Sequence, residues 1–286
     1  MKTLKALLIF ALVLSGALAQ AGPAQAGVPS TVTLTAEDVS TAGDIEVAIQ
    51  QATQWGSRPG TVILDGSQGP FVYTLAEGND YTVNIFHSNI SLVGSNGAVL
   101  SNTQGIFFDD LPADHILIKN LTMYCETDCI VSWGNHWDVQ IQNVTLYASG
   151  IGIQVAQTDG WSILRSTIQG GWTAVHVLEA SNVSIVGNQL SGFIPVILMN
   201  AHNNQVKLNT LAGSYQGVLL TAPSSYNRVI ANSISGVEQS GVSLEDGTFG
   251  NRVIDNVVSC APGVECLTVS ADGSAAELNK IFGNLP

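Results

Sequence analysis

One histidine stands between two valines in the segment GWTAVHVLEA, residues 171–180, and a glutamate follows three residues later. An imidazole and a carboxylate at one end of a strand are groups that general acid–base catalysis uses. His176 and Glu179 are therefore the first catalytic candidates. The adjacent acids Asp109 and Asp110 are further catalytic candidates, because carboxylate pairs cleave glycosidic bonds. The alternative is that His176 is an exposed strand residue and that the acids are solvated turn residues.

Four of the five tryptophans lie close together in the sequence, at Trp133, Trp137, Trp161 and Trp172. Aromatic rings on loops often mark binding surfaces, and flat rings stack well on the apolar faces of sugars. These four residues are predicted to contact a sugar chain. The alternative is that they seal loop clusters over a hydrophobic core.

The four cysteines fall into two close pairs, Cys125 with Cys129 and Cys260 with Cys266. An even number of cysteines in an exported chain favours disulfides, and the close spacing makes the local pairings the simplest connectivity. A metal site is the rival interpretation, but no histidine lies at ligand spacing from either pair. We therefore expect two local disulfides and no metal site at the cysteines.

The first residues have the pattern of a targeting segment. Lys2 and Lys5 precede the apolar run ALLIFALVL, and small residues at 17–19 and 24–26 offer cleavage sites. Residues 1–26 are thus expected to be a signal peptide, cleaved after residue 19 or 26. Because no cysteine follows either site, we expect a secreted or periplasmic protein without a lipid anchor, and no later run is long enough to span a bilayer.

The charge balance narrows the range of partners. Nine basic and 22 acidic residues give a net charge of −13, which offers no basic footprint for nucleic acid or anionic membranes. The same charge repels polyanionic glycans unless bound cations screen it. Lys119 and Arg165 either contact an anionic group or are simply exposed strand residues.

The elements that would position these side chains form a repeat. Segments such as GIQV, AVHV and GVLL recur every 21 to 25 residues, beginning at Gly105, Cys129, Gly152, Ala174, Pro195, Gly217, Gly241 and Cys266. A period of this length, made of short alternating strands without a helical pattern, predicts an all-β solenoid of stacked coils. We expect about eight to nine coils in one domain over residues 61–286.

The alternation within each repeat assigns its residues to two sides. Inward positions are apolar except Ser132, and they run through Ile106, Ile130, Ile153, Val175, Val196, Val218, Val242 and Leu267, with a second apolar position two residues later. The outward column is Phe107, Val131, Gln154, His176, Ile197, Leu219, Ser243 and Thr268. Gln154, next to His176, joins the predicted sugar-binding residues. The column lacks the converging carboxylates of a metal-dependent lyase, so the sequence shows no calcium motif and leaves calcium dependence open.

An asparagine ladder accompanies the repeat, at Asn120, Asn143, Ser166, Asn188, Asn209, Asn232, Asn256 and Asn284. Asparagine tolerates left-handed backbone angles at corners, and its amide can bond to the next copy. By this repeat and ladder, from Thr61 onward, the chain resembles the right-handed parallel β-helix superfamily. That superfamily includes pectate lyases, polygalacturonases and NosD-type periplasmic proteins. The resemblance implies a single-stranded right-handed parallel β-helix whose outward column faces the cleft, although the catalytic motifs of polygalacturonases and pectate lyases are absent.

Residues 27–60 are predicted to cap the N-terminal end of the solenoid. Asp44 is expected to cap a helix that carries Ile45, Val47, Ala48, Ile49 and Ala52 and ends near Gly56. Such a helix would cover strand edges that otherwise invite aggregation. No comparable cap is evident at the C-terminal end, which is expected to be exposed or paired with another molecule.

Two functions remain open from the sequence. The first is an exported β-helix protein that binds an extracellular polysaccharide and modifies it as a divergent lyase, hydrolase or epimerase. The second is a non-catalytic periplasmic or cell-surface scaffold that resembles NosD-type proteins, although the clustered Met and His that copper handling needs are missing. Whether the chain is an enzyme stays undecided.

Overall fold

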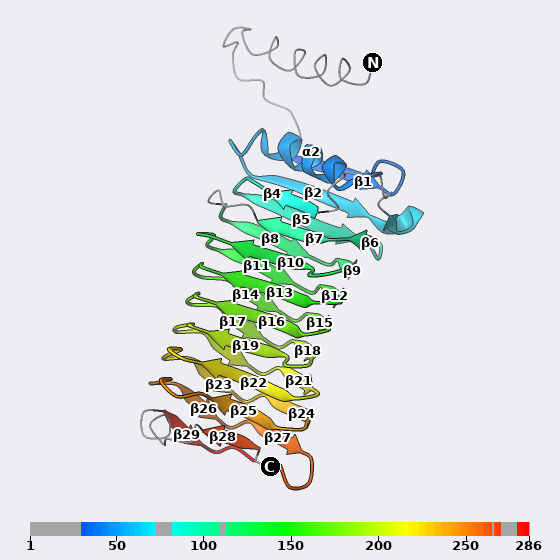
Figure 1. Cartoon of the computed structure of the whole chain (residues 1–286). Coiled ribbons are helices and arrows are strands. Elements are labelled where there is room, and N and C mark those ends of the chain that lie inside the picture. Colours follow the sequence, from blue (N-terminus) through cyan, green and yellow to red (C-terminus); the bar gives the residue numbers. More distant parts are fainter. Residues whose placement is uncertain (1–29, 73–81, 109–112, 265, 270–278, 286) are drawn as a thin grey trace, which may run out of the picture.

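The computed structural model describes residues 30–72, 82–108, 113–264, 266–269 and 279–285. The chain winds into a parallel β-solenoid in which most coils add one strand to each of three sheets (Figure 1). The expected signal peptide, residues 1–26, lies outside the described residues. None of the helices within the described part of the chain has the length and apolar character needed to cross a membrane.

The strands are short and evenly distributed over the three sheets. Sheet A contains β1 (Thr31–Thr35), β2 (Gly60–Asp65), β5 (Ile90–Ser95), β8 (Ile116–Lys119), β11 (Val139–Gln142), β14 (Ser162–Leu164), β17 (Ser184–Val186), β20 (Gln205–Lys207), β23 (Arg228–Ile230), β26 (Arg252–Ile254) and β29 (Lys280–Phe282). Sheet B contains β3 (Phe71–Val72), β6 (Val99–Thr103), β9 (Thr122–Cys125), β12 (Thr145–Ala148), β15 (Thr167–Gly170), β18 (Gln189–Gly192), β21 (Thr210–Gly213), β24 (Ser233–Val237) and β27 (Val257–Cys260). Sheet C contains β4 (Thr82–Ile85), β7 (Gly105–Phe108), β10 (Ile130–Trp133), β13 (Ile151–Ala156), β16 (Thr173–Leu178), β19 (Val196–Met199), β22 (Gln216–Thr221), β25 (Ser240–Leu244) and β28 (Leu267–Val269).

The predicted register of sheet C is confirmed residue by residue. Each predicted inward residue pairs with its counterpart in the next coil, from Ile106 through Ile130, Ile153, Val175, Val196, Val218 and Val242 to Leu267. All but Leu267, which is half-buried, are at most 1% exposed. Ser132 is also fully buried, and its hydroxyl has no hydrogen-bond partner. One continuous apolar core therefore runs between the three sheets.

The asparagine ladder exists, but it begins later than predicted. Ser166 is its first member, because its backbone N–H donates to Asn188 Oδ1 at 2.8 Å. From Asn188 to Asn256, each backbone N–H and each side-chain amide donates to the side-chain Oδ1 of the next ladder residue at 2.9–3.0 Å. Asn120 and Asn143 do not belong to it, because they occupy the exposed corner one residue earlier, with φ of 58° and 50°. Among the buried members the left-handed residue is likewise the preceding one: Arg165, Gly187, Leu208, Ala231, Asp255 and Gly283. The ladder amides thus serve hydrogen bonding, and their neighbours make the turn.

A second ladder, which the sequence analysis missed, supports the corner before sheet A. It consists of Asn204, Asn227, Asn251 and Asn279, whose amides donate to one another at 2.9–3.0 Å. Each of the first three also donates to a backbone carbonyl of the preceding coil. The recurring asparagine before the segments QVK, RVI, RVI and KIF is the signal that could have identified it.

The N-terminal end is capped as expected, with corrections in detail. The N-cap residue of helix α2 (Ala42–Thr53) is Thr41. Asp44 is the N3 residue of the capping box and not the N-cap itself. The helix ends at Thr53, and Val47 is 50% exposed because it points away from the core. On the helix, a carboxylate oxygen of Glu46 accepts 2.7 Å hydrogen bonds from the backbone and side-chain N–H groups of Asn84 in the edge strand β4. Strand β1, which was not predicted, extends sheet A before the helix.

Both predicted disulfides are confirmed, with Cα–Cα distances of 5.3 Å for Cys125–Cys129 and 5.6 Å for Cys260–Cys266. The second lies near the C-terminal end of the solenoid. There, an apolar cavity of about 170 Å³ is lined by Val242, Val253, Val258, Cys266, Leu267, Asn284 and Leu285. Pairing of this end with another molecule stays a prediction.

Candidate functional site

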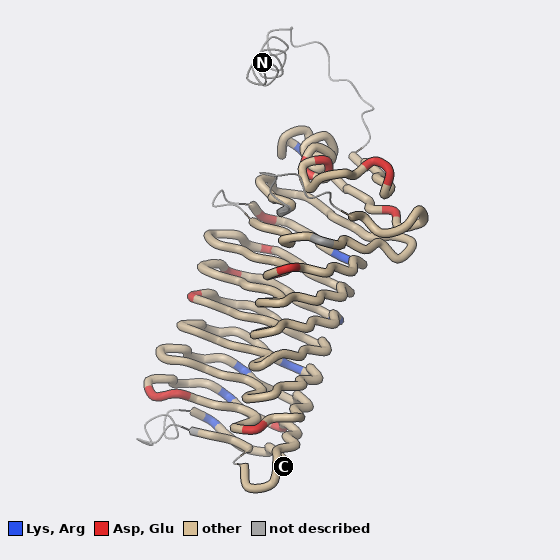
Figure 2. The backbone as a smooth tube through the Cα atoms, turned by 45° about the vertical axis from the view of Figure 1, so that its right-hand side comes forward, with Lys and Arg blue, Asp and Glu red and all other residues tan. Residues whose placement is uncertain are grey.

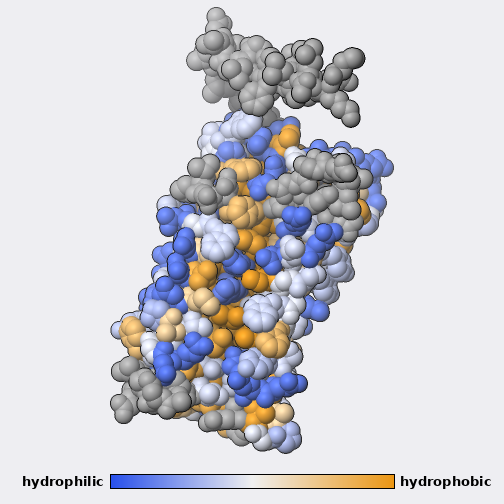
Figure 3. Space-filling model, in the orientation of Figure 1, coloured by the Kyte–Doolittle hydropathy of each residue, from blue (hydrophilic) through white to orange (hydrophobic). Residues whose placement is uncertain are grey.

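On the outer face of sheet C, the central residues are less exposed than the residues on either side, and we call this face the trough. Its central column has the predicted order, with Gln154 beside His176 and His176 beside Ile197. Although these side chains point away from the core, Gln154 is 7% and Ile197 is 5% exposed, so the flanking residues rise above them. Figure 3 shows a hydrophobic band that runs along this face.

A stack of aromatic rings borders the trough where the sheet C strands begin. Trp172 stacks on Phe193 at a ring-centroid distance of 5.1 Å, and Phe193 stacks on Tyr215 at 4.8 Å. Because the stacked rings cover each other's faces, they offer mainly their edges to solvent. Trp172, the first ring of the stack, is 52% exposed and retains an open surface.

A polar groove of about 680 Å³ borders the other side, where the sheet C strands end. Trp137, 49% exposed, lines it together with the amides and carboxylates of Asn135, Gln157, Asp159, Glu179, Asn182 and Asn203. Two contacts order these groups: Gln157 Nε2 donates to Glu179 Oε2 at 3.0 Å, and Asn182 Nδ2 donates to Asp159 Oδ1 at 2.6 Å. Left-handed corners at Gln157, Glu179 and Asn182 turn the chain here.

His176 lies half-buried at the centre of the trough. Its Nε2 is inaccessible to solvent and has no hydrogen-bond partner, and burial lowers the pKa of the imidazole. Strand β16 ends at Leu178, and Glu179 occupies the left-handed corner after it, whereas His176 lies on the face of the strand. Glu179 is exposed and belongs to the polar groove, so the structure does not join the predicted catalytic pair into one contact.

Of the other predicted sugar-binding tryptophans, Trp133 lies on the surface and Trp161 lies in the core. Trp133, 39% exposed, is at the end of β10 and faces outward. Trp161 is fully buried: its Nε1 donates to the carbonyl of His136 at 3.0 Å and to Thr158 Oγ1 at 3.1 Å. The sugar-contact prediction for Trp161 is therefore wrong, because it is a core residue. Asp109 and Asp110 lie outside the described residues.

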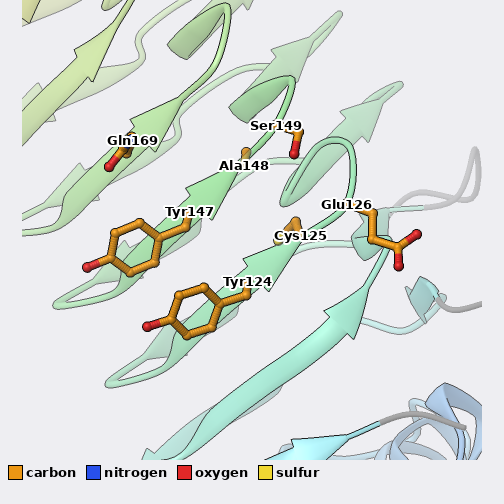
Figure 4. Close-up of a pocket in the computed structure, with 7 residues that line it drawn as sticks. All are labelled: Tyr124, Cys125, Glu126, Tyr147, Ala148, Ser149 and Gln169. Atoms are coloured by element: carbon orange, nitrogen blue, oxygen red, sulfur yellow. The ribbon is translucent and has the colours of Figure 1, made fainter.

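Sheet B carries a separate pocket that the sequence analysis did not predict. Tyr124 and Tyr147 stack at 4.8 Å beside a cavity of about 380 Å³, which Glu126 and Gln169 also line (Figure 4). The repeated segments TMYC and TLYA were the available signal, since both place tyrosine at the same outward position. Among the described residues, His, Cys, Asp and Glu form no group of three or more able to hold a metal ion.

Several known proteins resemble this chain in structure. An ORF18 protein of Geobacillus virus E2 matches with a TM-score of 0.60 and 12% identity over 88% of this chain, and this chain spans only 60% of the viral one. The surface adhesin PfbA of Streptococcus pneumoniae matches with a TM-score of 0.60 and 15% identity, over 88% of this chain and 77% of the adhesin chain. The A-module of the mannuronan C-5 epimerase AlgE6 of Azotobacter vinelandii matches with a TM-score of 0.45 and 14% identity, over 88% of this chain and 98% of the module. At these identities the likeness concerns the fold alone.

The sequence itself identifies the family. No curated protein is significantly similar to the chain. Residues 128–281, more than half of the chain, match the family described as the right handed beta helix region. With its three parallel sheets and stacked coils, the protein belongs to this right-handed β-helix family.

Proposed function

We propose that the protein binds an extended extracellular polysaccharide along the outer face of sheet C. The observation that carries this proposal is the trough itself, which is bordered by partly exposed tryptophans on both sides and by a polar groove on one. An elongated site of this kind suits a polymer, because the solenoid repeats similar surfaces along its axis. The two disulfides fit an oxidising compartment, as expected for a secreted or periplasmic protein.

The chemistry of the trough favours a neutral glycan. Apolar floor residues and aromatic rings suit the apolar faces of sugars, while the amides and carboxylates of the groove suit their hydroxyl groups. The described strands of sheet C contain no lysine or arginine, so this face has no cation in its strands to pair with a uronate or sulfate.

Turnover of the glycan is the second candidate function. It is favoured by His176, the ionisable side chain of the outward column, whose Nε2 has no hydrogen-bond partner; because this atom is inaccessible to solvent, a glycan would contact it only after the imidazole rotates. A neutral imidazole can accept or donate a proton through this atom. However, no second catalytic group among the described residues touches His176, so binding is the function that the geometry supports best. If the protein binds no glycan, the alternative function is that of a non-catalytic periplasmic or cell-surface scaffold.

The test is electrophoresis of the protein through gels that contain neutral glycans, followed by an assay for new reducing ends. We expect one glycan to retard the wild type, and we expect Trp137→Ala to weaken the retardation. Trp55→Ala is the matched control, because Trp55 is 68% exposed but follows the capping helix, away from the trough. Equal retardation of both variants would refute this site. Release of product by the wild type but not by His176→Ala would add catalysis, and no retardation by any glycan would leave the scaffold.

A further inference from the structure

The outer face of sheet A has a charge pattern opposite to that of the whole chain. Its two outward columns run in register from Thr61 to Lys280 and from Ile63 to Phe282. Both columns lack Asp and Glu, although the chain has 22 acidic and only nine basic residues. They contain five of the nine basic residues: Lys119, Lys207, Arg228, Arg252 and Lys280.

Three of these cations are stacked directly on one another near the C-terminal end. Arg228 pairs in register with Arg252, and Arg252 pairs with Lys280. Neighbouring strands lie about 4.8 Å apart, so the Cα atoms of the three residues lie in a row about 10 Å long. All three are exposed, and within the described residues none forms an ion pair. Lys207, half-buried in the adjacent column, extends the row by one coil.

Like charges that are directly opposite each other in a sheet destabilise it unless an opposite charge is bound. Along these strands, the nearest described carboxylate is that of Asp255, at the left-handed corner three residues after Arg252. In Figure 2, several Lys and Arg positions (blue) lie on the lower coils, while Asp and Glu (red) lie mostly at turns. Among the described residues, no carboxylate forms an ion pair with this row of positive charge.

We propose that Arg228, Arg252 and Lys280 form a binding row for a linear acidic polysaccharide on sheet A. A single row of cations along the axis matches a chain that carries an anionic group on successive sugars. Arginine recognises carboxylate and sulfate groups through paired hydrogen bonds, and two of the three residues are arginines. This site is distinct from the trough on sheet C and does not rest on the function proposed for it.

The test compares polymers that differ only in charge. Wild-type protein is run, at about 50 mM salt, over columns of dextran and of carboxymethyl-dextran. We expect stronger retention on carboxymethyl-dextran than on dextran, despite the net charge of −13, and this excess should weaken roughly tenfold at 200 mM salt because counterions are released. Retention on carboxymethyl-dextran that is no stronger than on dextran would overturn the proposal.

Variants locate the binding on sheet A. Arg228→Gln/Arg252→Gln/Lys280→Gln should abolish this excess retention, whereas Arg228→Lys/Arg252→Lys/Lys280→Arg, which keeps each charge, should preserve it. Trp137→Ala, in the polar groove beside sheet C, should be retained like the wild type. Excess retention of the neutral triple variant would overturn the proposal, and so would tighter binding of the wild type to anionic phospholipid vesicles than to carboxymethyl-dextran.

Discussion

Replacing Asn232 by alanine is the sharpest test of how the coils are held together. Asn232 is 1% exposed, and its side-chain Oδ1 accepts hydrogen bonds from the backbone N–H and the side-chain amide of Asn209, both at 3.0 Å. Its own amide donates to the carbonyl of Val206 and to Asn256 Oδ1, both at 2.9 Å. Alanine thus leaves the Asn209 N–H, one Asn209 amide hydrogen and the Val206 carbonyl buried without these partners.

Each buried polar group that loses its partner costs about 1–3 kcal/mol, so the three groups together should lower the free energy of unfolding by about 3–9 kcal/mol in Asn232→Ala. The expected fall in Tm is at least about 6 °C. Urea unfolding followed by circular dichroism measures the first quantity, and thermal unfolding measures the second. Hydrogen exchange at the Asn209 amide should also speed up, because its acceptor is gone.

The control is Asn143→Gly, which removes an exposed amide pair with Asn120 at 2.9 Å and keeps a residue that tolerates the φ of 50°. It should cost less than about 1 kcal/mol. If Asn232→Ala destabilised the protein no more than Asn143→Gly does, the buried ladder would not be the stabilising element that we infer.

Three further predictions follow from the same contacts. Leu208 is 56% exposed with a left-handed φ of 56°, so Leu208→Asn should raise stability by about 1 kcal/mol, whereas Leu208→Ala should bring no gain; thermal unfolding compares them. Glu46→Ala should lower the free energy of urea unfolding by about 1–2 kcal/mol, because it removes the acceptor for the N–H groups of Asn84, and Glu46→Gln should cost less. Burial lowers the pKa of His176 from its ordinary 6.5, so the unfolded chain binds its proton first as pH falls. Stability should therefore decrease below pH 6.5 until the folded pKa is passed; His176→Gln should reduce this acid sensitivity in Tm measured against pH, and an unchanged pH profile would contradict the assignment.

The repeat predicted the fold well because one physical requirement recurs in every coil. Each strand must bury one side, and the alternation around Ile130, Val175 and Val218 therefore determined both the register and the outward column. The local disulfides followed from spacing for a similar reason. The ladder's first members were misplaced because Asn120 and Asn143 are also corner residues, and the sequence does not distinguish an exposed corner amide from a buried one.

The site was less predictable, because it depends on how loops close over the outer face. Trp137 and Trp161 both come just before a strand of sheet A, yet Trp161 finds acceptors in His136 and Thr158 and is buried, while Trp137 remains open to solvent. The aromatic stack also escaped notice, since only stacking of the coils brings Trp172, Phe193 and Tyr215 together. His176 is separated from Glu179 because strand β16 ends at Leu178, which places His176 on the sheet and Glu179 at the corner that follows.

The measurement that tests the central proposal most directly is quenching of tryptophan fluorescence by acrylamide, with and without neutral glycans. The protein should carry Trp55→Phe, which removes the exposed tryptophan outside the trough region. Among the remaining tryptophans, Trp133, Trp137 and Trp172 are 39%, 49% and 52% exposed, and Trp161 is buried. We predict that a bound glycan lowers the quenching constant and that Trp137→Ala reduces this protection. Quenching that no glycan changes would contradict the assignment of sheet C as a polysaccharide-binding face.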